Sequence, residues 1–220
     1  MPDTAVPIVD LPAASLPLAA GALLELQIGT GVDSSFKISA EDLLAQASSG
    51  RHMVPIMSGA IQPSVTGGCA AIASVASAAN QPDIVTLNFD TTTQEYAQFA
   101  IPMPESWDEG TITFQPIWSH AATTTNFGVV FDLQLVAVSN DDPIAVAFGT
   151  AVTSTDTGGT TNDVYVGPES AAITVAGTPQ TGDTVFGRIS RVVADAGDTL
   201  AIDARLHGIR LYLTTNAAVD

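Results

Sequence analysis

The chain has 220 residues, of which 46% are hydrophobic and 13% charged, and its formal net charge is −17. This length and apolar content suffice for a hydrophobic core and exclude an intrinsically disordered chain. Only 6 basic residues stand against 23 acidic ones. The sequence therefore argues against binding to nucleic-acid phosphates or to an anionic membrane surface, because both need clusters of Lys and Arg.

Residues 11–28, LPAASLPLAAGALLELQI, form an apolar strip near the N-terminus. A secretion signal begins with a positively charged segment, but the first basic residue is Lys37. A membrane helix needs about 20 apolar residues with few interruptions, and Pro12, Pro17 and Glu25 interrupt this strip. The strip therefore predicts an extended segment that its own domain or a partner must cover.

Residues 1–50 predict a small module made of an extended arm, a hairpin and a short helix. Short strands are expected at 22–28 and 36–38, and Ser39 is a candidate N-cap for the helix that follows. Such a module buries little core of its own. Residues 51–83 are rich in Gly, Ser, Ala and Pro and predict a connector with one or two weak strands.

From residue 84 onward the sequence alternates apolar and polar residues with a period of two, as strands do. Turn-rich segments separate the candidate strands, and no long helical pattern interrupts them. The pattern predicts a mainly β chain whose residues 84–220 form an antiparallel, jelly-roll-like β-sandwich. The candidate strands are 84–90, 96–101, 111–118, 129–138, 145–152, 162–167, 171–177, 183–193 and 208–215.

Catalytic and metal-binding motifs are absent from the sequence. His52, His120 and His207 lie far apart and lack metal-ligand spacing. No Gly-x-Ser-x-Gly elbow or phosphate-binding loop occurs. The single cysteine, Cys69, has no basic neighbour in sequence and is expected to be a small buried residue. We therefore expect no enzyme activity, no cofactor and no metal.

The acidic turns at 140–142 and 156–163 contain several oxygen ligands of the kind calcium prefers. The order of an EF-hand loop, with its bidentate Glu, is missing from both. Asn, Asp, Ser and Gly also favour tight turns for conformational reasons alone. These segments are therefore interpreted as solvated turns.

Four of the five arginines lie between residues 188 and 210. One hypothesis is that Arg–Asp pairs fix the register of two strands joined by the turn DAGDT, residues 195–199. The other is that the same residues form ion pairs between subunits. The residues concerned are Arg188, Arg191, Asp203, Arg205 and Arg210.

Tyr96, Trp107 and Trp118 come from one region of the sequence. Aromatic rings of this kind form the platforms on which sugars stack, so they are candidates for a glycan-binding site. Packing of the tryptophans in the core is the alternative.

Residues 11–44 resemble the N-terminal segment of bacteriophage tail-fibre and related virion fibre proteins, in which an LPAA-x-x-PL strip precedes a hairpin. That segment holds the fibre to the particle, so the resemblance implies virion attachment through Leu11, Pro12, Pro17, Leu18, Leu23, Leu24, Leu26 and Ile28. The residues that carry the match are Leu11–Ala14, Pro17–Leu18, Gly21, Leu24–Glu25, Lys37–Ser39 and Asp42–Leu43.

Residues 85–216 resemble a C-terminal domain of uncharacterised phage proteins. The landmarks are MPESWDEGTITFQPIW, with Trp107, Gly110, Thr111 and Trp118, and the stretch AGDTLAIDARLHGIRLYLTTNA. That family has no activity to carry over. Phage fibres and spikes are usually homotrimers, so the resemblance implies three chains around one axis.

The sequence therefore predicts a structural, non-enzymatic bacteriophage virion protein: a short homotrimeric tail or head fibre, or spike, located on the virion. Residues 1–50 would attach it to other structural proteins of the tail, neck or capsid, and the outward-facing head would serve host attachment. The alternatives are a capsid decoration or cement protein and a carbohydrate-binding module that recognises a host surface glycan. A depolymerase is disfavoured because no β-helix repeat is seen.

Overall fold

The computed structural model describes residues 23–27, 35–39, 50–121 and 126–216. The chain divides into two compact units, residues 1–49 and residues 50–220. In the first unit, β1 (Leu23–Gln27) pairs antiparallel with β2 (Ser35–Ser39), as the sequence predicts. The predicted arm and the predicted helix after Ser39 lie outside the described residues.

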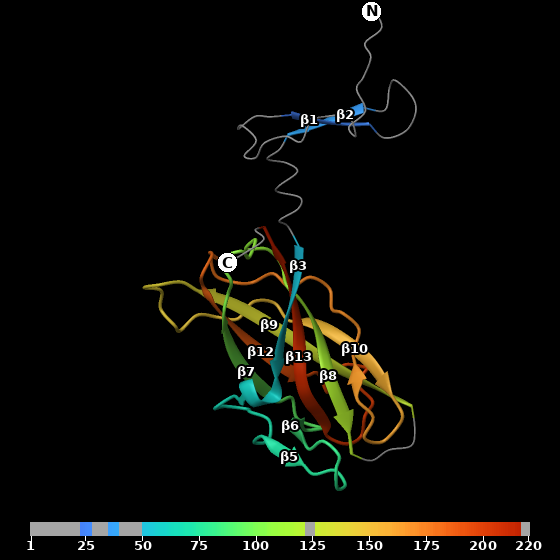
Figure 1. The fold of residues 1–220 in the computed structure, drawn as a ribbon. Coiled ribbons are helices and arrows are strands. Elements are labelled where there is room, and N and C mark those ends of the chain that lie inside the picture. The colour runs from blue at the N-terminus through green and yellow to red at the C-terminus, as the bar shows by residue number, and fades with distance from the viewer. Residues whose placement is uncertain (1–22, 28–34, 40–49, 122–125, 217–220) are drawn as a thin grey trace, which may run out of the picture. The chain divides into compact units, whose positions relative to one another are not determined.

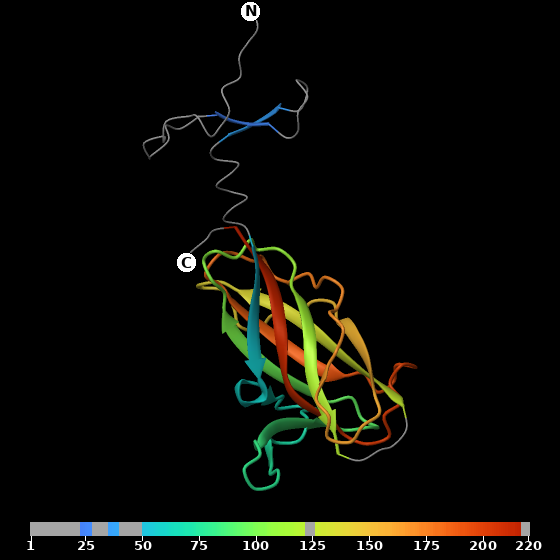
Figure 2. The same cartoon turned by 45° about the vertical axis from the view of Figure 1, so that its right-hand side comes forward.

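The second unit consists of two antiparallel sheets, seen in two views in Figures 1 and 2. One sheet has five strands in the order β10-β9-β12-β7-β4, and the other has the order β11-β8-β13-β6-β5, with β3 also paired to β13. The strands are β3 (Gly50–Met57), β4 (Gln62–Pro63), β5 (Ala73–Val75), β6 (Ile84–Phe89), β7 (Tyr96–Pro102), β8 (Thr113–His120), β9 (Phe127–Val138), β10 (Val152–Gly158), β11 (Tyr165–Val166), β12 (Thr184–Arg191) and β13 (Ala204–Thr215).

The strand order is that of a jelly roll. From β6 to β13 the chain crosses to the opposite sheet at every connection except β9 to β10, which are antiparallel neighbours. The result is β6-β13-β8-β11 in one sheet and β7-β12-β9-β10 in the other. Such double Greek-key arrangements bury one face of each sheet against the other. The fold confirms the predicted mainly β, jelly-roll-like sandwich.

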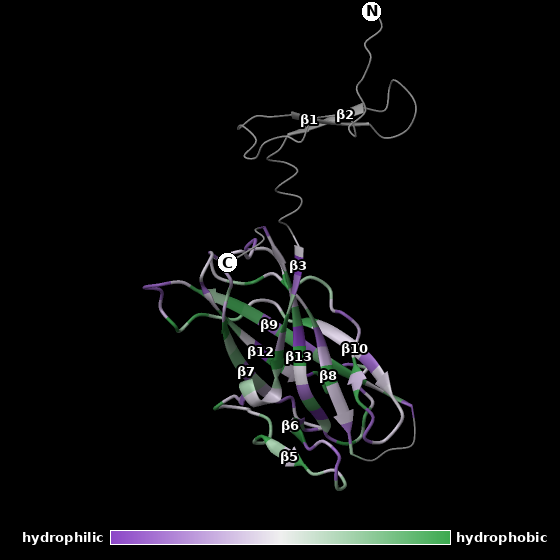
Figure 3. Cartoon of the chain, viewed as in Figure 1, coloured by the Kyte–Doolittle hydropathy of each residue, from purple (hydrophilic) through white to green (hydrophobic). Residues whose placement is uncertain are grey.

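Side chains that alternate along the strands fill the space between the sheets. In β12, Val185 and Ile189 are fully buried, and in β9, Leu133 and Leu135 are. These positions are two or four residues apart, which is the period that places side chains on one face of a strand. Figure 3 shows the apolar character of β9 over most of its length.

Residues 51–83 are not a connector, because they belong to the sandwich. Strand β3 pairs with β13 over eight positions, from Gly50 opposite Thr215 to Met57 opposite Gly208. This strand is difficult to recognise in the sequence. Only its Ile56 is buried, and the apolar alternation is therefore weak. Strand β6 pairs with the remainder of the same edge of β13. On the other edge, the pairing of β13 with β8 has a register shift between Leu206 and Gly208.

Two of the predicted strands are loops. Residues 145–152 lie between β9 and β10 and form no strand before Val152, and residues 171–177 contribute only isolated bridges at Ile173 and Ala176. Instead, the polar sequence VTSTDTG forms β10. Only one of its seven residues, Ser154, is buried, so the strand carries little apolar pattern and its composition resembles that of a turn.

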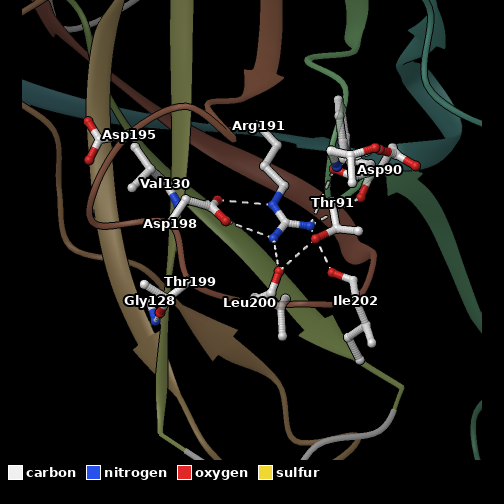
Figure 4. A network of polar contacts seen from close by, with 12 residues as sticks. Asp90, Thr91, Gly128, Val130, Arg191, Asp195, Asp198, Thr199, Leu200 and Ile202 are labelled. Atoms are coloured by element: carbon white, nitrogen blue, oxygen red, sulfur yellow. Dashed lines mark hydrogen bonds and ion pairs between the residues drawn. The ribbon is translucent and has the colours of Figure 1, made fainter.

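An ion pair is buried where the loop after β12 folds back onto the sandwich (Figure 4). The side chains of Arg191 and Asp198 are 0% and 3% exposed, and the guanidinium donates to both carboxylate oxygens, at 3.0 and 2.7 Å. Arg191 also donates to the backbone carbonyl oxygens of Ile202, Leu200, Phe89 and Asp90.

The same loop is fixed by its neighbours in β9. The backbone N–H of Val130 donates to Asp198 at 3.1 Å, and that of Gly128 donates to the hydroxyl of Thr199 at 2.9 Å. Residues 195–199 therefore do not join a hairpin, contrary to the sequence-based hypothesis. They carry the chain from β12 in one sheet to β13 in the other.

Within the described residues no helix is both long and apolar enough to cross a membrane.

Replacing Arg191 by Met should lower the free energy of unfolding by about 3–5 kcal/mol, because Asp198 then stays buried without its counter-charge. Urea unfolding followed by circular dichroism would measure this loss. Arg210→Met is the matched control, since Arg210 is a partly exposed arginine of β13. The control should lose less than about 1 kcal/mol. Equal losses in the two variants would contradict the role assigned to Arg191.

Candidate functional site

A row of polar side chains crosses the outer face of the five-stranded sheet, the face directed away from the core. The strand registers place Gln62 opposite Gln98, Gln98 opposite Arg188, and Arg188 opposite Gln134. The row thus spans β4, β7, β12 and β9. The neighbours of Gln98 and Gln134 in β7 and β9 are buried core residues, so the row is a product of strand alternation. These neighbours are Ala97, Phe99, Leu133 and Leu135.

Arg188 occupies the middle of the row and is fixed on several sides. Its Nε and Nη2 donate to Oε1 of Gln134, at 3.0 and 2.6 Å. The Gln134 side chain in turn donates to the carbonyl oxygen of Gly149 at 2.8 Å. The Arg188 Cζ atom lies 4.6 Å from the ring centre of Tyr96 and 5.0 Å from that of Phe148. These contacts hold the guanidinium in a defined position.

A cleft of about 460 Å³ opens beside Arg188. Tyr96 forms part of it, and the loop that follows β4 forms a wall, because the backbone N–H groups of Ser64 and Cys69 both donate to the carbonyl oxygen of Tyr96. Gln98 donates to the hydroxyl of Ser64 at 3.1 Å, which ties the row to this wall. The lining residues are Gln62, Pro63, Ser64, Val65, Thr66, Tyr96, Gln98 and Arg188.

Gly187 lets Phe99 pack directly beneath the row. The two residues are opposite each other in register, and a Cβ atom on Gly187 would lie 2.1 Å from the Phe99 ring. The close approach of the ring to the backbone of β12 needs a residue without a side chain. The backbone that carries Arg188 is therefore supported from the core side.

A buried carboxyl group lies next to the row. Ser190 donates a short hydrogen bond to Asp132, its register partner in β9, and accepts one from Gln94 at 3.0 Å. Burial raises the pKa of the Asp132 carboxyl, and the hydrogen bonds from Ser190 and the charge of Arg188 offset part of that rise.

The outer face of the other sheet carries a similar arginine–tyrosine pair. The Cζ atom of Arg51 lies 3.8 Å from the ring centre of Tyr212, and its Nη2 lies 2.5 Å from a carboxylate oxygen of Glu169. The hydrogen bond from Thr113 and, after it, the contact with Arg51 lower the pKa of Glu169. This arginine therefore has a carboxylate partner, whereas Arg188 is held by an amide.

Of the three predicted platform residues, only Tyr96 lies at the cleft. Trp107 and Trp118 are fully buried in the core, so neither can stack on a ligand from the surface. Trp118 stacks on Tyr165 with ring centres 4.7 Å apart and donates its indole N–H to Asp156 at 2.9 Å. Both tryptophans therefore pack in the core, which is the alternative to a glycan platform that the sequence also allows.

The charged residues between 188 and 210 are not brought together. Arg188 lines the cleft, Arg191 is buried inside the chain and is not available to another subunit, and Arg205 donates to Asn162 at 3.2 Å. Arg210 is partly exposed on β13 and Asp203 is exposed in the loop before it. Within the described residues the ion pairs are Arg191–Asp198 and Arg51–Glu169.

The predicted attachment residues fall mainly outside the described residues. Leu23, Leu24 and Leu26 belong to β1. The others are Leu11, Pro12, Pro17, Leu18 and Ile28, which lie outside the described ranges.

The histidines and the cysteine are distributed through the fold. His120 is buried beside the Phe127 ring, and His207 is bonded to Ser119 at 2.8 Å; burial lowers the pKa of both imidazoles. Cys69 is buried, and burial raises the pKa of its thiol to about 12. Over residues 50–121 and 126–216, no group of three or more His, Cys, Asp or Glu is placed to hold a metal ion.

A second cleft, of about 510 Å³, lies between residues 75–84 and the loop before β11, where Asn162 and Val164 line it. None of its lining residues is ionisable. Its chemistry therefore offers apolar contacts and a few amide and hydroxyl groups.

Sequence analysis did not identify Gln62, Gln98, Gln134 or Phe148 as site residues. A usable pattern was present, because Gln98 and Gln134 are each a single polar residue with a long side chain inside an apolar strand segment, YAQFAI and FDLQLV. Such residues face away from the core on neighbouring strands. That the two strands flank β12 follows only from the sheet topology.

No protein-family model matches the chain, and no curated protein matches its sequence. Among solved structures, a xylan-binding domain from carbohydrate-binding module family 22 is similar over 76% of this chain and 96% of its own, with 12% identity and a TM-score of 0.39. A family 11 module from Clostridium thermocellum, in complex with a β-1,3-1,4-mixed-linked tetrasaccharide, covers 88% and 96%, with 11% identity and a TM-score of 0.33.

A structure of infectious bursal disease virus, Gx strain, is similar over 93% of this chain and 47% of its own, with 11% identity and a TM-score of 0.32. At these identities and TM-scores, none of the similarities supports an assignment of function.

The Asp132 carboxyl should make stability depend on pH in a defined direction. Because its pKa is raised in the folded protein, its stabilising contribution is complete below the unfolded value of about 3.9 and is lost as the pH rises through the folded value. Asp132→Asn keeps an acceptor for Ser190 but cannot ionise. Its stability relative to the native chain should therefore be greater at pH 7 than at pH 4.

Urea unfolding at both pH values would measure this difference. Asp203→Asn is the control, because Asp203 is exposed and its replacement also removes one negative charge. A stability difference for Asp132→Asn that does not change between pH 4 and pH 7 would contradict the prediction.

Proposed function

We propose that residues 50–220 form a non-catalytic carbohydrate-binding module whose ligand lies in the cleft beside Arg188. The observation that carries the proposal is the row Gln62, Gln98, Arg188 and Gln134 on an open sheet face, with Tyr96 beside it. The cleft volume is in the range typical of ligand sites.

The side chains suit a ligand with many hydroxyl groups. A glutamine amide both donates and accepts hydrogen bonds, and a guanidinium offers several donors in one plane. Neighbouring hydroxyls of a sugar ring can satisfy such groups in pairs. The ring of Tyr96 offers an apolar surface for the C–H face of a sugar, together with a polar tip. A row across four strands also provides the length that an oligosaccharide requires.

The side chains of the site are already held in place before a ligand binds, and this favours the binding of a flexible sugar chain. Gln134, Gln98 and Arg188 are already held by contacts with Gly149, Ser64 and Tyr96. Little side-chain entropy then remains to be lost when a ligand binds.

Binding of fluorescently labelled protein to an array of neutral and acidic glycans would test the proposal. For the glycans that bind, Tyr96→Ala should weaken the affinity tenfold or more, because an anchoring aromatic contact is lost. Tyr212→Ala is the matched control, since Tyr212 also pairs with an arginine but on the opposite sheet. No binding to any glycan, or equal loss in both variants, would contradict the proposal.

A second candidate function is the structural virion role, as a short homotrimeric fibre or spike or as a decoration protein. The observation that favours it is the N-terminal unit, whose hairpin β1–β2 coincides with the segment that resembles virion attachment regions. A glycan-binding head is compatible with this role, because a virion protein at the surface can bind a host glycan.

Light scattering of the full chain would test the trimer. A mass near three times 22.5 kDa is expected for the full chain. Residues 50–220 contain their own core, so this fragment should remain folded by circular dichroism. It should also fail to join virus particles, because the attachment unit is missing. A full chain that is monomeric would contradict the homotrimer, and a fragment that still joins particles would contradict N-terminal attachment.

A further inference from the structure

Arg188 is the only arginine at the cleft, and its charge has no carboxylate within ion-pair distance in the described part of the chain. Two of its N–H groups donate to Gln134. A guanidinium has five N–H donors, so three of them, those of Nη1 and one of Nη2, have no acceptor among the residues that contact it. Donors of a charged group at a cleft need an acceptor from water or from a ligand.

Two other arginines of the described residues, Arg205 and Arg210, also form no ion pair with a carboxylate, but neither of them lines the cleft. Acidic residues outnumber basic ones by 23 to 6, and each of the two described ion pairs contains one arginine. Arg191 is joined to Asp198 and Arg51 to Glu169. The neighbouring acidic group, Asp132, is bonded to Ser190, and burial disfavours its ionised form.

We infer that the ligand of this cleft carries a carboxylate, which accepts hydrogen bonds from the free edge of Arg188. This inference rests on the proposed glycan-binding function and names the class of sugar: a glycan with a uronic or sialic acid residue. The planar guanidinium matches a carboxylate with two parallel N–H···O bonds. The rings of Tyr96 and Phe148 lie against the guanidinium. Because Nε and one N–H of Nη2 are bonded to Gln134, the edge formed by Nη1 and Nη2 remains free.

The overall charge limits the ligand further. A surface with a net charge of −17 repels polyanions over long distances. The inferred ligand is therefore a largely neutral glycan with a single acidic sugar in the recognised segment. The Gln62 and Gln98 amides would then contact the hydroxyls of the neutral sugars beside it.

Matched pairs of oligosaccharides would test the inference by isothermal titration calorimetry with the full chain. The probes are 3′-sialyllactose against lactose, and a disaccharide ending in glucuronic acid against its carboxyl-reduced form. The acidic member should bind at least tenfold more tightly, as expected for charge-assisted hydrogen bonds. Raising the salt concentration to 1 M should reduce the difference.

Arg188→Met should remove the preference for the acidic member, and Arg188→Lys should retain part of it, because it keeps the charge but loses the planar fork. Arg51→Met is the matched control on the other sheet and should preserve the preference. Circular dichroism would check that each variant is folded. If the Met variant is unfolded, the Lys variant decides the test.

The outcomes separate this inference from the proposed function. If neutral and acidic members bind equally, the inference is overturned and glycan binding stands. If neither these probes nor any glycan of the array binds, the proposed function fails, and the inference fails with it.

Discussion

The register of β12 between β7 and β9 determines both the interior and the surface of this sandwich. Its sequence RISR places two arginines three residues apart, so that they point to opposite faces of the sheet. Arg191 enters the core side and Arg188 remains on the outer face. A slip of one residue would exchange the two faces along the whole strand, so the buried ion pair also fixes the position of the surface arginine.

The two arginines of β12 lie in different electrostatic environments. A buried guanidinium is tolerated only with a counter-charge and acceptors for its remaining donors, and Asp198 with the carbonyl groups of four residues provides them. On the outer face, an amide and two aromatic rings position Arg188 without neutralising it. The chain itself supplies acceptors for Arg191, whereas some N–H donors of Arg188 have no acceptor among the residues that contact it.

The sequence predicts the fold well where strands are buried on one face. The alternation in IVTLNF, YAQFAI and VVFDLQLVAV directly identifies β6, β7 and β9. It fails at the edges, because β3 and β10 each bury only one residue and carry little apolar pattern. Residues 145–151 form a loop although the sequence predicts a strand there, because the segment is rich in apolar residues but lies outside the sheets.

The site was less predictable than the fold, since it is assembled from four strands that are distant in sequence. Tyr96 and Arg188 were both named from the sequence, but for different roles, and only the strand order places them together. The tryptophans were more prominent in the sequence, yet large aromatic residues are as useful to a core as to a binding surface. Composition alone cannot distinguish an aromatic residue of the core from one of a binding surface. The face of the sheet to which its position in the strand belongs does distinguish them.

The pairing of β3 with β13 also has a mechanical consequence. Gly50 and Thr215 are register partners, so the chain enters and leaves the sandwich side by side at one end. Tension applied through both ends would act on one pair of backbone hydrogen bonds at a time and peel β3 from β13. A pull on the N-terminal end against a ligand held at the cleft would instead load many bonds in parallel. A tether joined at Gly50 would therefore bear load best when the opposing force comes from the bound ligand.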